Sequence, residues 1–412
     1  MKKVSIWLFS LCLLLVGCGA SSTSHSSLKI ANHVEYGKED YQNIVSPINA
    51  LGFDLLAKAP RDVNGNIFVS PLSLFMALSM VYNGADGVTL EEMNKVLHAN
   101  GLTSDDINKA NASIMTLLDQ NSDKVQLHIA NSIWLNNKYS FQENFEKTNK
   151  DYFNAEIKEI DVQNSQSPKL INDWVNGKTN GKIDKIVREE LNPGLVTMLI
   201  NAIYFKGNWT YPFDPTLTKE KTFTLEDGTK IKVPLMELHD ELPYTKNDVF
   251  QAVSLPYGDE NTSMKVFLPN EDMSLKEFEE LLTLEQWQDW QSSFYKTRGT
   301  ILLPKFILEY EVELKETLEA LGMPTAFNNA NFSKMIEDNS NIAISSVKQK
   351  TYIDVSEEGT EAAAVTSVEM TETAMQPMYE PFHMEVNRPF FIAIVDNTSG
   401  SILFMGSIKN PK

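Results

Sequence analysis

Cysteine is nearly absent from this chain of 412 residues, which contains only Cys12 and Cys18. Both lie in or beside an apolar run at the N-terminus. The remaining chain therefore has no disulfide, no thiol nucleophile and no cysteine-based metal site. Its stability must come from packing, and a domain of about 370 residues can bury a large core.

The sequence also lacks the motifs of the common catalytic sites. It contains no Gly-x-Ser-x-Gly turn and no His-Glu-x-x-His motif, and Gly177-Lys178-Thr179 lacks the upstream glycine of a phosphate-binding loop. The 6 histidines are scattered without the spacing of metal ligands: His25, His33, His98, His128, His239 and His383. We therefore predict a protein that is not an enzyme and that has neither a metal site nor a cofactor.

Positive charge is scarce as well. The chain has 36 Lys and Arg against 55 Asp and Glu, which gives a net charge of −19. Without Lys2 and Lys3, which precede the N-terminal apolar run, 34 basic and 55 acidic side chains leave a charge of −21. Phosphate backbones repel such a chain, so we predict no nucleic-acid partner and no basic helix that binds polysaccharides.

The N-terminal segment has the pattern of an export signal. Two lysines precede the apolar run 4–16, which is too short to span a membrane comfortably. The run ends in Leu15-Val16-Gly17-Cys18, which looks like a bacterial lipobox, where cleavage precedes the cysteine and lipid joins its thiol. We predict a signal peptide over 1–17 and lipidation at Cys18. An ordinary secretion signal, with Cys18 incidental, is the alternative.

Residues 18–39 form the expected link between this signal and the folded part. They are rich in serine as far as Asn32 and short of large apolar groups, so we predict a flexible tether. A lipid group holds a protein on a membrane surface rather than across it. The predicted location is outside the cytoplasm, lipid-anchored at the bacterial cell surface or envelope membrane, with no other membrane contact.

Residues 40–412 show no internal repeat and no second linker, so we predict one large domain. An apolar strand at 66–69 is followed by Ser70-Pro71, which fit the cap and first turn of a helix. Thr89 and Glu92 fit a capping box that opens the next helix. The mixture of helix patterns with extensive strand patterns indicates an α+β fold.

The segment 195–205 is apolar almost throughout, which predicts a strand buried on both faces of a sheet. Asn201 interrupts this run. A buried amide without hydrogen-bond partners costs roughly 1–3 kcal/mol, so we expect Asn201 to belong to a polar network.

The stretch 355–389 has an unusual composition. Its residues 360–373 contain no Gly or Pro, and most of their side chains are small. In an extended strand, one face would consist of Thr360, Ala362, Ala364 and Thr366. Such a strand could enter a crowded sheet without steric obstruction. A surface helix or a mobile loop is the alternative on local sequence alone, because EAAAV has good helix propensity.

Two segments carry a resemblance to a known family. The run EEGTEAAAVT at 357–366 resembles the hinge of the serpin family, and NRPFFIAIVDNTSGSILFMGSIKNP at 387–411 resembles its closing strands. Further blocks match in the same order over roughly 40–412. The resemblance implies a serpin-like α+β fold with three mixed β-sheets, about eight or nine helices and an exposed reactive loop at about 356–388.

The resemblance implies a suicide-substrate inhibitor of serine proteases, and sometimes of cysteine proteases, that acts as a monomer. In that mechanism the protease cuts the loop, and the freed loop enters the central sheet as a new strand. The alternative is a non-inhibitory relative, a binding protein whose loop is merely cleaved. The small hinge side chains favour the inhibitor.

The resemblance also assigns site residues. The hinge comprises Glu357, Glu358, Gly359, Thr360, Glu361, Ala362, Ala363, Ala364, Val365 and Thr366. At the breach, where insertion begins, Glu357 is expected to pair with Lys305 beside Trp209. The shutter, a polar cluster beneath the opening, is expected to contain Ser70, Ser73, Asn201 and Gln349, where the family commonly has a His in place of the Gln.

The scissile bond is expected between Thr373 and Ala374, from the usual spacing after the hinge. Met370, Met375 and Met378 are alternatives, because the stretch that follows is longer than usual. Small or medium apolar residues at the cut suit elastase-like or subtilisin-like proteases and not trypsin-like ones.

Overall fold

The computed structural model describes residues 29–119, 124–188, 190–337, 342–360 and 380–412. Within these ranges the helices are α1 Gln42–Lys58, α2 Pro71–Tyr82, α3 Gly87–Val96, α4 Ser104–Leu118, α5 Glu143–Phe153, α6 Ser167–Lys178, α7 Leu275–Glu280, α8 Leu284–Ser292, α9 Lys315–Leu321 and α10 Thr325–Asn328, with a 3₁₀ turn at Pro215–Leu217. The strands are β1 Ile67–Val69, β2 Val125–Asn136, β3 Glu156–Ile160, β4 Thr197–Asn208, β5 Lys219–Thr224, β6 Lys230–Lys246, β7 Phe250–Tyr257, β8 Thr262–Pro269, β9 Tyr295–Pro304, β10 Phe306–Glu313, β11 Ile344–Ser356, β12 Gly359–Thr360, β13 Phe382–Glu385, β14 Phe390–Asp396 and β15 Ile402–Ile408.

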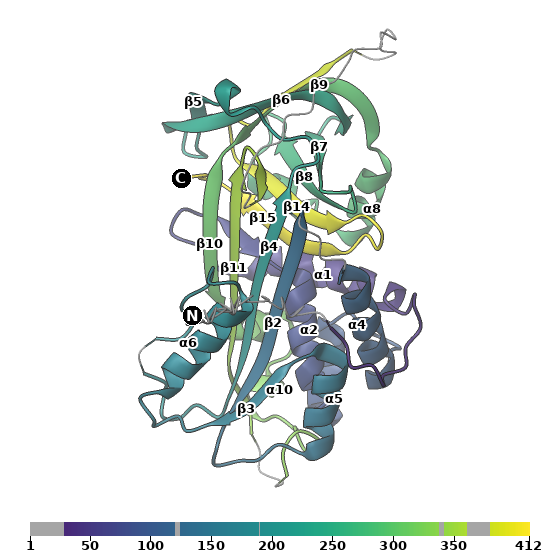
Figure 1. The fold of residues 1–412 in the computed structure, drawn as a ribbon, viewed down its shortest axis with the longest axis vertical. Helices are drawn as coiled ribbons and strands as arrows, with labels where there is room; N and C mark the ends of the chain where they lie inside the picture. Colours follow the sequence, from purple (N-terminus) through teal and green to yellow (C-terminus); the bar gives the residue numbers. More distant parts are fainter. Residues whose placement is uncertain (1–28, 120–123, 189, 338–341, 361–379) are drawn as a thin grey trace, which may run out of the picture.

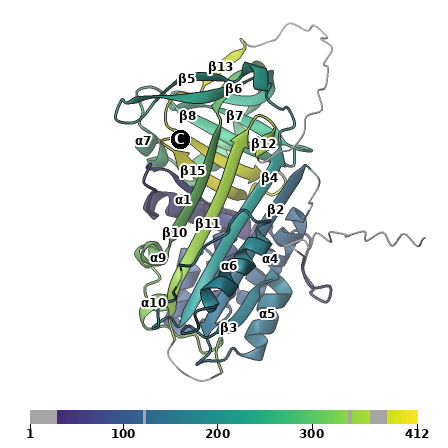
Figure 2. The same ribbon diagram turned by 60° about the vertical axis from the view of Figure 1, so that its left-hand side comes forward.

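A six-stranded sheet runs along the long axis of the molecule in the order β10-β11-β12-β4-β2-β3 (Figure 1). Strands β11 and β4 form a parallel pair from Ile344 beside Thr197 to Tyr352 beside Tyr204. At their C-terminal ends the two-residue strand β12 lies between them and is antiparallel to both (Figure 2). We call the boundary between β11 and β4 the seam.

The other strands form a nine-stranded sheet in the order β1-β15-β14-β8-β7-β6-β9-β13, with β5 paired to β6. The α+β class is confirmed. Hydrogen bonding gives two mixed sheets rather than three, because the 17-residue β6 continues without a break from its pairing with β5 to its pairing with β7. The described chain has ten helices rather than eight or nine, since it includes short ones such as α10.

Strand β4 is buried on both faces, as its apolar run predicts. Leu199 and Ile203 belong to the main core, on the face covered by α2, whereas Met198 and Ile200 belong to a second cluster beneath α6. Figure 2 shows α6 in front of the sheet, opposite the helices on its other face. The sheet therefore cannot open without disturbing a packed layer on each side.

The N-terminus of α2 also follows the sequence prediction. Ser70 is the N-cap, and its side chain accepts a hydrogen bond from the backbone N–H of Ser73, with Pro71 at the first helical position. All 12 residues of this helix are buried. Because α2 crosses behind β4, its first turn lies directly beneath the seam.

The capping box predicted at Thr89 and Glu92 is wrong. Helix α3 begins earlier, at Gly87. Thr89 Oγ1 accepts a hydrogen bond from the backbone of Asn331 at 2.9 Å, and Glu92 accepts from the backbone of Thr325 at 2.9 Å. Both side chains are therefore engaged by segments far away in the sequence.

The tether predicted over 18–39 is shorter within the described part of the chain. Ile30 is buried in the main core, and the N–H of Ala31 donates to the carbonyl of Asp151 in α5. Val34 and Tyr36 also pack against this core, so the segment is packed against the body from residue 30.

Candidate functional site

The hinge enters the sheet through a tight hairpin between β11 and β12. Ser356 pairs with Gly359 across the two-residue loop Glu357-Glu358. Gly359 has φ +146, and a Cβ added there would lie 2.1 Å from the carbonyl oxygen of Gly207. Only glycine fits this position, because the hinge backbone presses directly against the backbone of β4.

Glu357 forms the expected pair with Lys305. Lys305 Nζ lies 2.7 Å from Glu357 Oε2, and Thr218 Oγ1 donates to Oε1 at 2.9 Å. The backbone N–H of Phe213 donates to the Glu357 carbonyl at 2.8 Å. Burial pushes the pKa of Glu357 upward, but the hydrogen bonds from Lys305, its own backbone and Thr218 outweigh burial and hold that pKa below its ordinary value. The carboxylate is therefore ionised at neutral pH and fixes the hairpin loop.

Trp209 lies beside this pair, as the resemblance implies. Its indole Nε1 donates to the carbonyl of Ser356 at 2.9 Å, and its backbone N–H donates to the carbonyl of Glu358 at 3.0 Å. Its ring stacks on Tyr257 with centroids 4.3 Å apart and planes at 12°. Trp209 thus joins the hairpin to the nine-stranded sheet.

Tyr257 and Thr218 are breach residues that the sequence did not identify. The hydroxyl groups of Tyr257 and Thr360 are 2.7 Å apart, and both residues are fully buried. No local pattern places this ring beside the hinge, because β7 and β12 lie more than a hundred positions apart.

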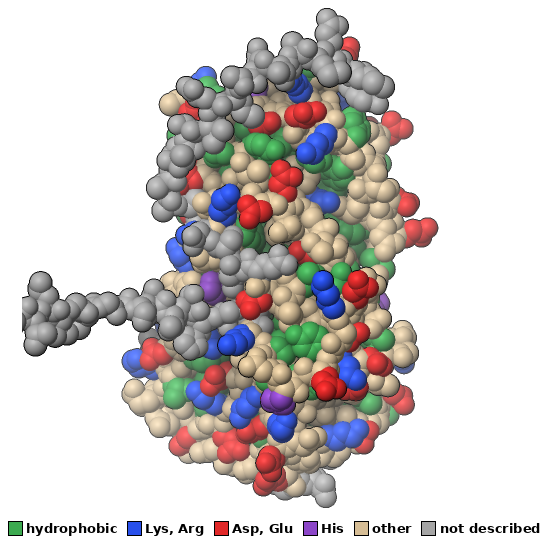
Figure 3. All heavy atoms as spheres, turned by 45° about the vertical axis from the view of Figure 1, so that its right-hand side comes forward, with side chains coloured by type: hydrophobic (Ala, Val, Ile, Leu, Met, Phe, Trp, Pro, Cys, Tyr) green, Lys and Arg blue, Asp and Glu red, His purple; other side chains and the backbone are tan. Residues whose placement is uncertain are grey.

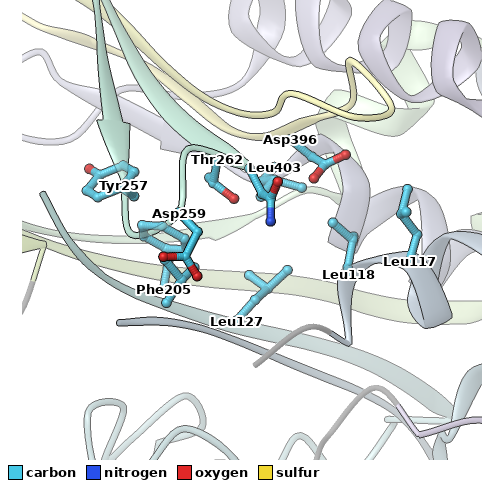
Figure 4. Close-up of a pocket in the computed structure, with 11 residues that line it drawn as sticks. Leu117, Leu118, Leu127, Phe205, Tyr257, Asp259, Thr262, Asp396 and Leu403 are labelled. Atoms are coloured by element: carbon cyan, nitrogen blue, oxygen red, sulfur yellow. The ribbon is translucent and has the colours of Figure 1, made fainter. Parts of the chain in front are cut away.

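The breach adjoins a small cavity of about 120 Å³ (Figure 4). Phe205 and Tyr257 lie on one side of it, and Leu117, Leu118 and Asp396 lie on another. Burial raises the pKa of Asp396, although the hydroxyl and N–H of Ser399 donate to its carboxylate at 2.6 and 2.7 Å. Phe205 and Tyr257, two aromatic residues at the breach, therefore pack against other side chains on one side and border the cavity on the other.

The predicted shutter residues converge beneath the seam. Asn201 and Gln349 are paired in the register of β4 and β11, and Gln349 Nε2 donates to Asn201 Oδ1 at 2.7 Å. Gln349 also accepts from the Ser70 N–H at 3.1 Å and donates to the Ser70 carbonyl at 3.0 Å. Asn201 Nδ2 donates to Ser73 Oγ. These four side chains are all at most 1% exposed.

Asn131 completes this network, and sequence reasoning missed it. It lies on β2 in register with Asn201, and its Oδ1 accepts from Asn201 Nδ2 at 2.6 Å. Asn131, Asn201 and Gln349 thus form one row across β2, β4 and β11. The available signal was a polar residue inside the strand pattern 125–135, but its meaning depends on which residue faces it across the sheet.

Several predicted site residues lie outside the described part of the chain. They are the outer hinge Glu361, Ala362, Ala363, Ala364, Val365 and Thr366, the scissile pair Thr373 and Ala374 with the alternatives Met370, Met375 and Met378, and the lipidation site Cys18. The described residues bring together the first part of the hinge, from Glu357 to Thr360, with the breach and the shutter.

Among the described residues, no three His, Cys, Asp or Glu side chains are grouped so as to hold a metal ion. In the same ranges, no helix has both the length and the apolar character needed to span a bilayer. On the face seen in Figure 3, basic and acidic side chains are interspersed without a basic patch.

Comparison with known proteins agrees with this arrangement. The family model described as Serpin (serine protease inhibitor) matches residues 46–411. An uncharacterized serpin-like protein of Thermococcus kodakarensis is 36% identical over 396 residues, which cover 95% of this chain and 91% of that protein. Human Serpin B3 is 32% identical over 381 residues, which cover 87% of this chain and 97% of that protein.

Solved structures agree as well. The crystal structure of the thermophilic serpin tengpin in the native state aligns with a TM-score of 0.84 at 35% identity and covers 93% of this chain and 97% of that one. Human thyroxine-binding globulin in complex with thyroxine aligns with a TM-score of 0.80 at 26% identity and covers 90% of this chain and 100% of that one. With the family model matching nearly the whole described chain, this protein belongs to the serpin family.

Proposed function

We propose that this serpin inhibits serine proteases as a suicide substrate, by inserting its cleaved loop into the seam. Family membership supports a protease inhibitor in general, rather than an enzyme. The observation that carries the proposal for this chain is the position of β12. Two hinge residues already separate the ends of β11 and β4, and the Thr360 side chain points into the molecule.

The register of β12 supports continued insertion. Thr360 pairs with Gly207 on β4 and with Val355 on β11, antiparallel to both. Continued residue by residue, the same register puts Thr366 between Asn201 and Gln349. Because strand side chains alternate, Thr366 shares the inward face with Thr360, and so do Ala362 and Ala364. The inward positions from Thr360 as far as Thr366 are therefore all occupied by small side chains.

Insertion explains how the protease is held. The protease serine attacks the scissile carbonyl, forms an ester with the loop and releases the new amino terminus. The continued register carries Thr373 beyond Thr197, the first residue of β4, so the 360–373 ribbon moves the acylated end by about 45 Å. Deacylation needs the catalytic groups placed to within about 1 Å, so traction on the ester prevents hydrolysis.

The target class follows from the residue before the cut. Thr373, with Met370, Met375 and Met378 as alternatives, suits an elastase-like or subtilisin-like pocket. A cysteine protease is a further candidate, because it also forms an acyl-enzyme. We propose that the inhibitor acts as a monomer.

A binding protein whose loop is merely cleaved is the second candidate. Its support is the structural relative thyroxine-binding globulin, whose structure was solved in complex with thyroxine. The two candidates differ in the fate of the protease: an inhibitor retains it covalently, whereas a binding protein releases it after cleavage.

The test is incubation with pancreatic elastase and with subtilisin, followed by denaturing electrophoresis and mass spectrometry of the released C-terminal fragment. We expect a complex that survives boiling in detergent, a fragment that begins at Ala374, and a higher melting temperature after cleavage. Thr360→Arg should block insertion and turn the inhibitor into a substrate, whereas Thr398→Arg, in an exposed turn, should not. Inhibition by Thr360→Arg equal to that of wild type would exclude insertion as the mechanism.

We further propose export and lipid anchoring through Cys18, which would place the inhibitor at the envelope surface. The support is the lipobox-like run before Cys18. Metabolic labelling with a fatty-acid analogue in a bacterial host should modify wild type and not Cys18→Ser. Labelling of both proteins would contradict the assignment.

A further inference from the structure

The hinge residue Thr360 is held by a side chain from the other sheet. Tyr257 is the last residue of β7, and its hydroxyl lies 2.7 Å from Thr360 Oγ1 in a fully buried contact. Burial raises the pKa of Tyr257 well above its ordinary value, so the hydroxyl keeps its proton and can serve as the donor.

The Tyr257 ring has a defined place in the breach. It stacks on Trp209, and its edge meets Phe205 with centroids 5.0 Å apart. Gly207, the β4 partner of Thr360, leaves room for this ring, since a Cβ there would lie 2.8 Å from Tyr257 Cδ1. The ring, the glycine and the hinge residue therefore fit together as one unit.

The packing of the Tyr257 ring does not by itself fix the position of the Tyr257 hydroxyl. The cavity of about 120 Å³ borders both Tyr257 and Phe205, and Figure 4 shows the Tyr257 hydroxyl on the side away from it. The ring thus has space on one side. The hydrogen bond to Thr360 opposes motion of the ring into that space.

Few backbone pairs hold the described part of β12. Gly359 and Thr360 each pair once with β11 and once with β4. Isolated pairs of this kind open readily, because each backbone hydrogen bond contributes little net free energy. A buried hydrogen bond from an aromatic residue of the other sheet adds a contact that does not depend on the ends of β11 and β4.

We propose that Tyr257 is a positioning residue for loop insertion, with its hydroxyl holding Thr360 in the register from which the cleaved loop extends into the seam. This rests on the inhibitory function proposed above. Insertion competes with deacylation of the acyl-enzyme. While Thr360 stays paired with β11 and β4, the residues after it can pair with these strands one after another. If Thr360 has detached, the hinge must first pair with the strands again, at an entropic cost. Loss of the hydroxyl therefore directs more acyl-enzyme to hydrolysis.

The test measures the stoichiometry of inhibition, the number of inhibitor molecules consumed per protease inactivated, with the protease that forms a complex with wild type. Tyr257→Phe keeps the ring and removes the hydroxyl, and Thr360→Val removes the partner. Each should raise the ratio of hydrolysed to trapped acyl-enzyme, which is the stoichiometry minus one, by about fivefold, the effect of one net hydrogen bond. The double variant should be no worse than either single one, because both remove the same bond. Thr360→Ser, which keeps a hydroxyl, should restore most of the function.

Tyr244→Phe is the matched control. Its hydroxyl also donates in a partly buried site, to Gln251 Oε1 at 3.2 Å, but it does not contact the hinge. The control should leave the stoichiometry unchanged. A merely structural role for Tyr257 would instead lower the melting temperature of all forms without the non-additivity between Tyr257 and Thr360.

The outcomes separate the two proposals. If wild type forms complexes and Tyr257→Phe has the same stoichiometry, the role of Tyr257 is overturned and the inhibitory function stands. Additive effects of Tyr257→Phe and Thr360→Val also overturn it. If wild type forms no complex with any protease, the inhibitory function fails and this role fails with it. Should Tyr257→Phe not fold, Thr360→Val against Thr360→Ser tests the same bond.

Discussion

Replacing Gln349 by Ala should strongly destabilise the native protein. Gln349 is 0% exposed and makes three hydrogen bonds, two with the backbone of Ser70 and one with Asn201. Its removal leaves the Ser70 N–H and the Asn201 carbonyl oxygen without these partners in a buried site. Each unsatisfied group costs about 1–3 kcal/mol, and the vacated volume adds to this, so we expect a loss of about 3–5 kcal/mol.

Thr351→Val is the matched comparison on the same strand. Thr351 is also 0% exposed, but its hydroxyl donates chiefly to one carbonyl, that of Phe68 at 2.7 Å. The loss should be about 1 kcal/mol, the usual net value of one hydrogen bond. Urea unfolding followed by tryptophan fluorescence and by circular dichroism measures both variants, and agreement of the two probes checks that one transition is being followed.

The loop-cleaved forms give a second comparison. If the loop inserts in the proposed register, Thr366 supplies a hydroxyl beside Asn201, so Gln349→Ala should cost less after cleavage than before. Equal losses for Gln349→Ala and Thr351→Val in the native form would refute the network account of the shutter. A larger loss after cleavage would refute the proposed register.

Three further predictions concern the same machinery. Gln349→His introduces the residue common in the family. The variant should be as stable as wild type near neutral pH but lose stability below about pH 6.5, because a buried imidazole that must stay neutral has a lowered folded-state pKa. Urea unfolding midpoints measured against pH test this prediction, and a midpoint that does not change with pH would contradict it. The lowered pKa of Glu357 means that its contribution to stability is present above its unfolded pKa and is lost as acid protonates it. Tryptophan fluorescence should therefore change below about pH 4.5 in wild type and at a higher pH in Lys305→Met, which lacks the hydrogen bond that lowers this pKa. Gly359→Ala should cost about 1–3 kcal/mol and displace β12, which raises the stoichiometry of inhibition, whereas Gly194→Ala, where the nearest contact of the new Cβ is 3.4 Å away, should be neutral.

The sequence predicts the shutter well where burial makes a polar residue conspicuous. Asn201 stands alone in an apolar run, and a buried amide must find partners, so its participation in a network followed from solvation alone. Ser70 follows a strand and precedes a proline, which is enough to predict the cap. The identity of the partners came from the family resemblance, because hydrogen bonds across a sheet depend on register.

Register is also why the remaining site residues were missed. Asn131 becomes meaningful only when β2 is aligned with β4 so that it faces Asn201. Tyr257 becomes meaningful only when the end of β7 meets the hinge. The predicted number of sheets was wrong for a related reason. The sequence of β6 does not show whether it forms one long strand that pairs with both β5 and β7 or two strands with a break between them. Local patterns predict elements, whereas contacts between elements follow from the assembled fold.

If the cleaved loop inserts as proposed, the seam explains how the closed sheet can be stable and still favour an added strand. Strands β11 and β4 are parallel, and a strand between them runs antiparallel to both, so insertion exchanges one parallel ladder for two antiparallel ones, which are slightly more stable per residue. The opposing cost is the opening of the shutter, which separates Gln349 from Asn201 before any new partner arrives. In the continued register, Thr366 would then lie between these residues with a hydroxyl that can both donate and accept. The shutter would therefore raise the barrier to insertion while destabilising the inserted state little. A native form held in this way persists because insertion is slow, and not because the native form has the lower free energy.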